Sequence, residues 1–167
     1  FEPLIIGGGQ ERQRRSGTEN VPGIVGLSKA LELSVKEMEL ESSRQIKIRN
    51  HIFDYLKKNV DDLLINGDQI NRLPNNVNIS FPGIEGESIL LALDLGGVSA
   101  SSGSACSAAS IEPSHVLLAI GRSAEQARGT IRITIGRTTT NEDVQYMLNL
   151  LPNVVNKLKN MPSSITA

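Results

Sequence analysis

Cys106 is the only cysteine of the chain and lies in an unusual setting. Apart from Cys106, residues 102–110 are all Gly, Ser or Ala. A segment without large side chains packs little and moves easily, which suits a nucleophilic thiol that must reach a second site. The alternative is an inert Cys106, because many free cysteines are small buried hydrophobes. His115 is close to Cys106 in sequence. It either acts as a base for Cys106 or has a purely structural role.

Arg132 is the second candidate, because it interrupts a strand-like run of isoleucine and threonine at residues 130–135. Strand periodicity puts Ile131, Ile133 and Ile135 on one face and leaves Arg132 on the other. Burying an unpaired guanidinium is costly. Arg132 therefore either faces water from an edge strand or takes a substrate carboxylate as a bidentate fork.

A glycine-rich segment at residues 7–20 is the third candidate. Three consecutive glycines precede Arg12, Arg14 and Arg15, and a Ser-Gly-Thr turn ending at Thr18 follows. Glycines disfavour a regular element here and permit close backbone approach. Free N–H groups, guanidinium groups and hydroxyls together can hold an anion. The alternative is a flexible surface loop with solvated arginines.

The overall composition excludes several classes of function. The chain has 167 residues, a formal net charge of −1, 3% aromatic residues and no tryptophan. These values argue against a nucleic-acid-binding surface. A single cysteine excludes an internal disulfide, no metal-ligand spacing of His, Cys and acidic residues is present, and no apolar run approaches the roughly 20 residues that span a membrane. Because the sequence begins with Phe1 rather than Met, we expect a fragment of a longer protein.

The elements that must position these candidates are read from the hydrophobic pattern. Residues 21–60 show helical spacing, which predicts either a long helix that connects two domains or a break or kink near Ser42. Strands are predicted at residues 77–81, 98–101 and 130–135, and helices at 87–95, after Pro113, at 123–128 and from Thr140 onward. This order predicts an α/β (α+β) small domain in which three short strands pack with helices.

Three motifs together resemble the NifS/IscS-type cysteine desulfurases, which are class V aminotransferases of pyridoxal-phosphate fold type I. The first is Gly-Gly-Gly-Gln-Glu-Arg at residues 7–12 with Arg-Ser-Gly-Thr-Glu-Asn at 15–20. The second is Ser-Gly-Ser-Ala-Cys-Ser at 102–107 with Glu-Pro-Ser-His-Val-Leu at 112–117. The third is Thr-Ile-Arg-Ile-Thr-Ile-Gly-Arg-Thr-Thr at 130–139. The likeness covers essentially the whole chain, in order and spacing.

The resemblance implies a function and a role for each candidate. Such enzymes are homodimers with pyridoxal 5'-phosphate that convert L-cysteine to L-alanine and hold the sulfur as an enzyme persulfide. Cys106 would be the nucleophile that takes the sulfur, Arg132 would bind the substrate carboxylate, and Thr18 would contact the cofactor phosphate of the neighbouring subunit. Arg15 and Asn20 would support the loop. The resemblance further implies a cytoplasmic enzyme that passes sulfur to an acceptor protein such as an iron–sulfur scaffold, without nucleic acid or membrane.

One departure from the family pattern limits what the chain can do alone. The family's Schiff-base lysine, closely preceded by a histidine, has no counterpart here, and every lysine lies on a predicted helix. The chain therefore corresponds to the C-terminal portion of the aspartate-aminotransferase-like fold and is expected to be inactive by itself. We expect the end of the large cofactor-binding domain at residues 1–20, connecting helices at 21–60 and a small domain at 61–167 with the Cys106 loop at about 99–112.

Two other functions remain open from the residues alone. A reactive loop thiol would also suit a stand-alone sulfur-carrier or scaffold-binding module, which would need no cofactor. A structural or regulatory domain with an inert Cys106 is the third possibility.

Overall fold

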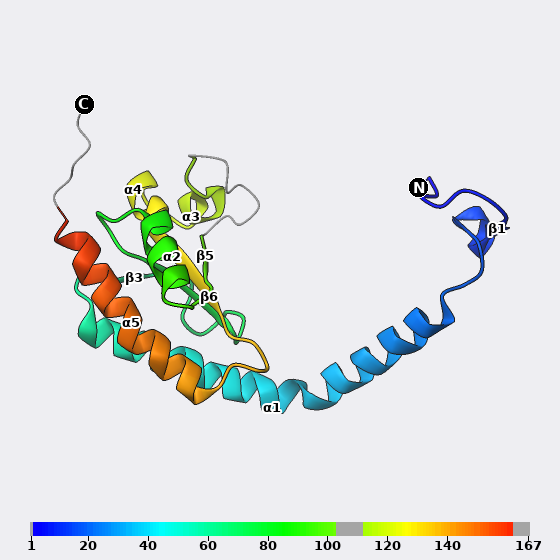
Figure 1. Ribbon diagram of the computed structural model, residues 1–167, viewed down its shortest axis with the longest axis horizontal. Helices are drawn as coiled ribbons and strands as arrows, with labels where there is room; N and C mark the ends of the chain where they lie inside the picture. Colours follow the sequence, from blue (N-terminus) through cyan, green and yellow to red (C-terminus); the bar gives the residue numbers. More distant parts are fainter. Residues whose placement is uncertain (1, 103–111, 162–167) are drawn as a thin grey trace. The chain divides into compact units, whose positions relative to one another are not determined.

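The computed structural model describes residues 2–102 and 112–161, and the chain divides into two compact units, Phe1–Leu40 and Glu41–Ala167 (Figure 1). The first unit holds a short hairpin and the beginning of a long helix. The second holds a four-stranded sheet with its helices.

The long helix α1 (Val21–Asn59) runs without interruption through Ser42. Of the two alternatives, the break near Ser42 is therefore wrong and the single long helix is confirmed. Pro22 lies in the first turn, where a missing N–H costs nothing. The Asn20 side-chain oxygen accepts a hydrogen bond from the N–H of Gly23 at 3.0 Å and so satisfies one of the free donors of that turn.

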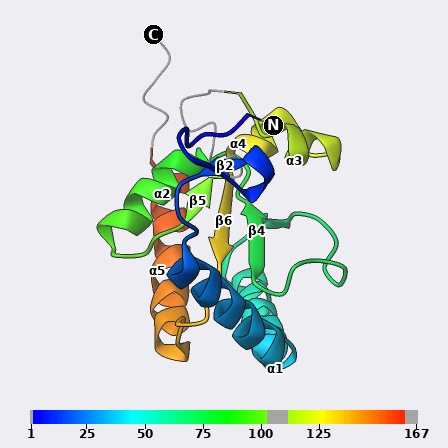
Figure 2. The same ribbon diagram turned by 90° about the vertical axis from the view of Figure 1, so that its right-hand side faces the viewer.

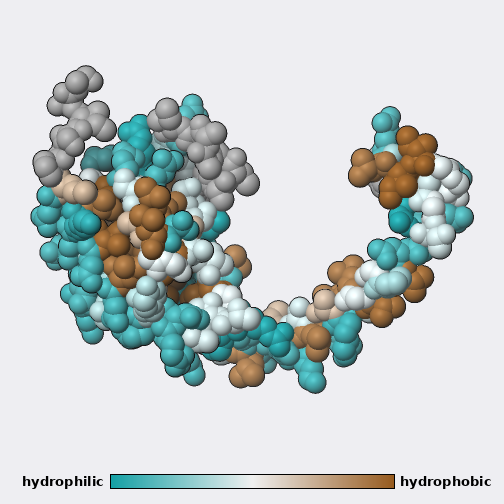
Figure 3. All heavy atoms as spheres, viewed as in Figure 1, coloured by the Kyte–Doolittle hydropathy of each residue, from teal (hydrophilic) through white to brown (hydrophobic). Residues whose placement is uncertain are grey.

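The two halves of α1 differ in what covers their apolar residues. In the second unit the predicted apolar positions are buried: Ile48, Ile52, Leu56 and Val60. In the first unit the equivalent positions are exposed, although they recur at the same helical spacing: Ile24, Leu27, Leu31, Val35 and Met38. Figure 3 shows apolar residues in brown along this part of the helix. No described residue covers this apolar face.

The sheet of the second unit is antiparallel throughout and has the strand order β3-β4-β6-β5. Its strands are β3 (Leu64–Ile65), β4 (Asn76–Ser80), β5 (Ser101–Ser102) and β6 (Thr130–Thr134). The alternation predicted for β6 is confirmed: Ile131, Ile133 and, just after the strand, Ile135 are buried. The register pairs Ile131 with Ile79 and Ile133 with Val77, so the apolar face is continuous across β4 and β6.

Three helices cover this apolar face: the second half of α1, α2 (Gly86–Leu95) and α5 (Asn141–Lys159). Figure 2 shows α2 and α5 beside each other along the strands. Gly86 permits the close approach of α2, because a Cβ there would lie 2.8 Å from the carbonyl oxygens of Arg128 and Thr130. The helices α3 (His115–Ala119) and α4 (Ala124–Arg128) lie between β5 and β6 in the sequence.

Most predicted elements agree with the structure, but the sheet has four strands rather than three because β3 was not predicted, and the glycine-rich segment contains the short strands β1 and β2. The second predicted strand is also displaced. It was expected at residues 98–101 but is formed by Ser101 and Ser102. The backbone after α2 explains the shift: Gly97 has a φ of 76°, and Val98 donates its N–H to the carbonyl of Leu93. Val98 therefore still belongs to the helix end, and strand pairing begins later.

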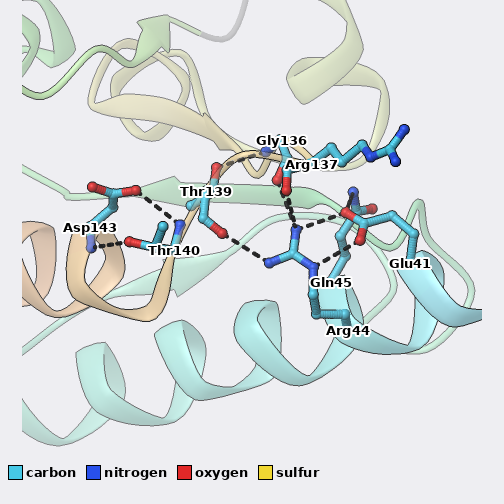
Figure 4. Close-up of polar contacts among 8 residues, drawn as sticks. All are labelled: Glu41, Arg44, Gln45, Gly136, Arg137, Thr139, Thr140 and Asp143. Atoms are coloured by element: carbon cyan, nitrogen blue, oxygen red, sulfur yellow. Dashed lines mark hydrogen bonds and ion pairs between the residues drawn. The ribbon is translucent and has the colours of Figure 1, made fainter.

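Arg44 joins α1 to the connection between β6 and α5 (Figure 4). Its guanidinium donates to the carbonyl oxygens of Gly136 and Thr139, both at 2.9 Å, and binds the two carboxylate oxygens of Glu41 at 2.7 and 2.8 Å. The hydrogen bond to Glu41 raises the pKa of Arg44 and lowers that of Glu41. The connection that follows β6 is thereby held against the helix that supports the sheet.

Candidate functional site

The glycine-rich segment of the first unit forms a tight hairpin. Strands β1 (Gly9–Gln10) and β2 (Arg15–Ser16) pair, and a turn at Glu11–Gln13 joins them. The three turn residues have φ values of 49°, 57° and 65°, in the left-handed region that residues other than glycine avoid. Such strain is kept where surrounding structure imposes it, and it clusters at functional sites.

Thr18 lies just after this hairpin and is exposed. Arg15 donates from Nη1 to the Thr18 carbonyl at 3.0 Å, and Asn20 caps the helix that follows. The backbone is therefore held on both sides of Thr18, while its hydroxyl makes no hydrogen bond to any described residue. A held backbone with a free hydroxyl can accept an anionic group.

The residues of the chain fit only one end of pyridoxal phosphate. The phosphate end fits the Thr18 loop, which offers a free hydroxyl. The covalent end needs an amine in a desolvated pocket. Every lysine lies on α1 or α5 and is exposed, as predicted from the sequence. Thr18 thus has a free hydroxyl that suits a phosphate, while no lysine of the chain meets the requirement for a Schiff base.

Arg132 lies at the centre of the sheet in the second unit. Strand β6 is flanked by β4 and β5, so the edge-strand alternative is wrong. The register places Asn78 on one side of Arg132 and Ser101 on the other. Arg132 is half-buried, and its guanidinium makes no hydrogen bond or ion pair to any residue of the described ranges. The Arg132 guanidinium, a bidentate donor, is therefore unpaired on the side of the sheet opposite the buried isoleucines.

The polar face is the side of the sheet opposite the three helices. On β4, β5 and β6 its side chains are polar or charged: Asn76, Asn78, Ser80, Ser101, Thr130, Arg132 and Thr134. Ser80 and Thr130 are fully buried at one end of this face, whereas Thr134 at the other end is exposed. Solvent exposure therefore increases along the strands, and Arg132 lies between the buried end of the polar face, which we call its closed end, and the exposed end.

A chain of hydrogen bonds crosses the closed end of the polar face. Arg122, between α3 and α4, donates from Nε to Oδ1 of Asn66 at 2.6 Å. Asn66 is buried and donates from Nδ2 to the Ser80 hydroxyl at 2.8 Å. The Ser80 and Thr130 hydroxyls are 2.6 Å apart, and Thr130 donates to the carbonyl of Gln126 at 3.0 Å.

The direction of these hydrogen bonds follows from the number of protons that each group can donate. A threonine hydroxyl carries one proton, and Thr130 gives it to Gln126. Ser80 must therefore donate to Thr130 and accept from Asn66. The buried polar groups from the Arg122 guanidinium to the Gln126 carbonyl thus all have hydrogen-bond partners, and each hydrogen bond polarises the next.

Two further arginines lie near the connection between β3 and β4. Arg49 is buried and donates to the Leu73 carbonyl at 3.2 Å. Arg72 stacks 5.0 Å above the Phe53 ring and donates to Oδ1 of Asn76 at 3.0 Å. Burial, together with the nearby Arg49 charge, lowers the pKa of Arg72. These contacts fix the loop that precedes β4.

Other sequence candidates cannot be brought into this geometry. Cys106 lies outside the described residues. His115 is the exposed first residue of α3 and follows Ser114, which is buried. Across residues 2–102 and 112–161, no group of three or more His, Cys, Asp and Glu residues could hold a metal ion. No helix within those ranges is long and apolar enough to cross a membrane.

Sequence reasoning missed Asn78, which the register places directly beside Arg132, and it missed Asn66 and Arg122, which are joined to Asn78 by hydrogen bonds. The alternation of Asn76, Asn78 and Ser80 along β4 is the signal that could have pointed to Asn78. No local signal exists for the contact between Arg122 and Asn66, which are 56 residues apart.

Comparison with known proteins adds the family. The profile of the aminotransferase class-V family matches residues 6–147. The cysteine desulfurase IscS of Dictyoglomus turgidum is 51% identical over 159 residues, which are 95% of this chain and 40% of that protein. IscS 1 of Archaeoglobus fulgidus is 49% identical over 161 residues, or 96% of this chain and 42% of that protein.

Solved structures agree with this result. A NifS-like protein superimposes with a TM-score of 0.78 at 35% identity, covering 95% of this chain and 40% of that one. A NifS-like protein from Rickettsia africae gives a TM-score of 0.77 at 32% identity, covering 92% and 40%. The chain thus spans about 40% of the length of these relatives. With a family match across most of its length, the chain belongs to the aminotransferase class-V family, and within it resembles the NifS/IscS-type cysteine desulfurases.

Proposed function

We propose that the chain is the C-terminal part of a cysteine desulfurase, which converts L-cysteine to L-alanine and holds the sulfur as a persulfide on Cys106. The relatives named cysteine desulfurase support this proposal, as does the shared order of the three motifs. The single observation that carries it is the unpaired guanidinium of Arg132 at the centre of the sheet.

Arg132 binds and orients the substrate in this proposal. Its planar fork matches the α-carboxylate of an amino acid, and two parallel hydrogen bonds fix the direction in which the rest of the molecule points. Because Arg132 is half-buried, the ion pair is less screened than one on the open surface. The buried isoleucines on either side hold the backbone of Arg132 in place.

Cys106 performs the sulfur transfer. Its thiolate attacks the sulfur of L-cysteine, an S–S bond forms, and the bond between that sulfur and the β-carbon breaks. The electron pair of the broken bond remains on the three-carbon fragment, which takes up a proton and leaves as L-alanine. Transfer of the terminal sulfur to an acceptor protein, such as an iron–sulfur scaffold, regenerates the thiol.

Pyridoxal phosphate, when bound, supplies the electron-withdrawing group that makes the carbon–sulfur bond labile. Thr18 would contact its phosphate through the free hydroxyl. The amine that holds it covalently comes from outside this chain, in the part of the relatives' length that the chain does not span. We therefore expect the chain alone to be inactive.

The exposed apolar face of α1 supports this arrangement. Burying such a stripe is the usual way in which a helix is stabilised in a folded protein. We propose that the rest of the enzyme covers it, including the cofactor-binding domain and the partner subunit of a homodimer. In this proposal the small domain comprises residues 61–167 and the connecting helix residues 21–60, and the second half of that helix completes the core of the small domain. The enzyme works in the cytoplasm.

The test uses the complete enzyme with pyridoxal phosphate and L-cysteine. Cys106→Ala should abolish the protein-bound persulfide, detected by mass spectrometry, while cofactor binding followed by absorbance remains. Arg132→Ala should raise KM for L-cysteine, whereas Arg128→Ala, an exposed arginine on α4, should not. Persulfide on the Cys106→Ala protein, or alanine formed at enzymatic rates by the chain alone, would contradict the proposal.

A further inference from the structure

Asn78 is the nearest polar neighbour of Arg132 on the next strand. The antiparallel register pairs the two residues directly, so their side chains leave the same face of the sheet with Cβ atoms about 5 Å apart. Asn78 is half-buried, as is Arg132. Any group that binds the Arg132 guanidinium therefore lies within reach of the Asn78 amide.

The orientation of the Asn78 amide follows from hydrogen bonds that begin at Arg122. An arginine can only donate, so the atom of Asn66 that receives Arg122 Nε must be its oxygen. The nitrogen of Asn66 is then the donor, and it gives one hydrogen bond at 2.8 Å to Oδ1 of Asn78. Its second N–H goes to Ser80.

This arrangement occupies the oxygen of Asn78 and leaves its nitrogen free. The Asn78 NH2 group donates to no residue in the described ranges. The other side chains of this face that lie on β4, β5 and β6 are uncharged, so no carboxylate of these strands competes for either donor. Arg132 and Asn78 together present a guanidinium fork and an amide NH2 to the same space.

A carboxylate is the ligand that matches these donors. Its two oxygens offer about four lone-pair directions, of which a bidentate guanidinium takes two. An amide N–H can take a third. A neutral hydroxyl or amide ligand would gain less, because the charge-assisted bond to Arg132 would be lost.

We propose that Asn78 is a second carboxylate-binding residue of this site and that its amide donates to the substrate α-carboxylate beside Arg132. Arg122 and Asn66 are positioning residues, because they keep the Asn78 nitrogen as the free end of that amide. This inference rests on the proposed function and adds a residue that determines specificity for an amino acid with a free carboxylate.

The experiment measures KM and kcat of the complete enzyme with L-cysteine, together with the inhibition constant of L-alanine, which carries the same carboxylate. Asn78→Asp replaces the donor by a negative charge and should raise both KM and the inhibition constant about tenfold or more, with kcat within about twofold. Asn78→Ala should raise both values by a smaller factor. Asn76→Asp is the matched control, on the same strand and face, and should leave KM unchanged.

Asn66→Asp tests the positioning residues. An aspartate still accepts from Arg122 but cannot donate to Asn78, so the Asn78 amide loses its fixed orientation. KM should rise while kcat changes little, and adding Asn78→Ala to this variant should have little further effect. A purely structural role would instead lower kcat and thermal stability together and leave the two substitutions additive.

The two proposals fail in different ways. If the unmodified enzyme forms no L-alanine from L-cysteine, the proposed function is wrong, and this inference is wrong with it. If the enzyme is active but Asn78→Asp and Asn76→Asp have the same KM, only the role of Asn78 is overturned.

Discussion

Replacing Thr130 by valine tests whether the buried hydrogen-bond chain stabilises the sheet. Valine has nearly the same shape as threonine, so packing is preserved while the hydroxyl is lost. Thr130 is 1% exposed, and its hydroxyl accepts from Ser80 and donates to the carbonyl of Gln126. The substitution therefore leaves a buried O–H and a carbonyl without partners.

The expected loss follows from the burial of these two groups. Leaving a buried polar group unsatisfied costs about 1–3 kcal/mol. The Ser80 hydroxyl is fully buried and carries that cost, whereas Gln126 is half-buried and adds less. The extra methyl group of valine returns about 0.8 kcal/mol of burial free energy. Thr130→Val should thus lower the free energy of unfolding by about 1–3 kcal/mol.

Urea unfolding followed by circular dichroism measures this loss, and Thr134→Val is its control. Thr134 lies on the same strand and face but is exposed, so the same change should stay within about 0.5 kcal/mol. In the Thr130→Val background, Ser80→Ala should cost about 1 kcal/mol less than alone, because the Ser80 O–H has already lost its acceptor. Equal losses of unfolding free energy for Thr130→Val and Thr134→Val would show that the buried hydrogen bonds do not stabilise the sheet.

Three other predictions concern the packing, capping and anchoring of the helices. Gly86→Ala should destabilise the fold by about 1–3 kcal/mol in urea unfolding, because the added Cβ would approach two backbone carbonyl oxygens at the start of β6; a neutral result would contradict this packing. Hydrogen bonds from Thr140 hold the pKa of Asp143 below its usual value of 3.8, so its contribution to stability is present above that pH and disappears as pH falls through the lower pKa of the folded state. Asp143→Asn should therefore reduce the loss of thermal stability at acid pH, and an unchanged acid profile would count against it. Arg44→Met should lower the thermal unfolding midpoint more than Lys36→Met on the exposed surface of α1, since only Arg44 holds backbone carbonyls of the β6–α5 connection; equal shifts would show that these contacts contribute nothing.

The elements built from local periodicity could be predicted from the sequence. The alternation in β6 and the helical spacing at Ile48, Ile52 and Leu56 are properties of neighbouring residues, and the structure buries the residues they indicate. The absence of a desolvated lysine could be predicted for the same reason, since every lysine lies in a helical pattern on an exposed side. Neither Leu64 nor Ile65 stands in a comparable pattern, so strand β3 was missed.

The candidate site was less predictable, because its residues meet only through the sheet. Arg132 was a candidate from its strand pattern, but its place on a central strand depends on pairing with β4 and β5. The orientation of Asn78 depends on Arg122, a residue on a distant connection. Such relations follow from strand order, which the chain's local composition does not encode. The role of Cys106 remains a prediction.

The alternation along β6 also has an evolutionary consequence. Ile131 and Ile133 face the core, while Arg132 between them lies on the opposite face of the sheet. A mutation at residue 132 can therefore change which ligand the strand binds without altering the packing that keeps the domain folded. Selection for a new substrate and selection for stability act on alternate residues of the same five-residue strand. A scaffold of this kind can diversify its chemistry through single substitutions at a low cost to folding.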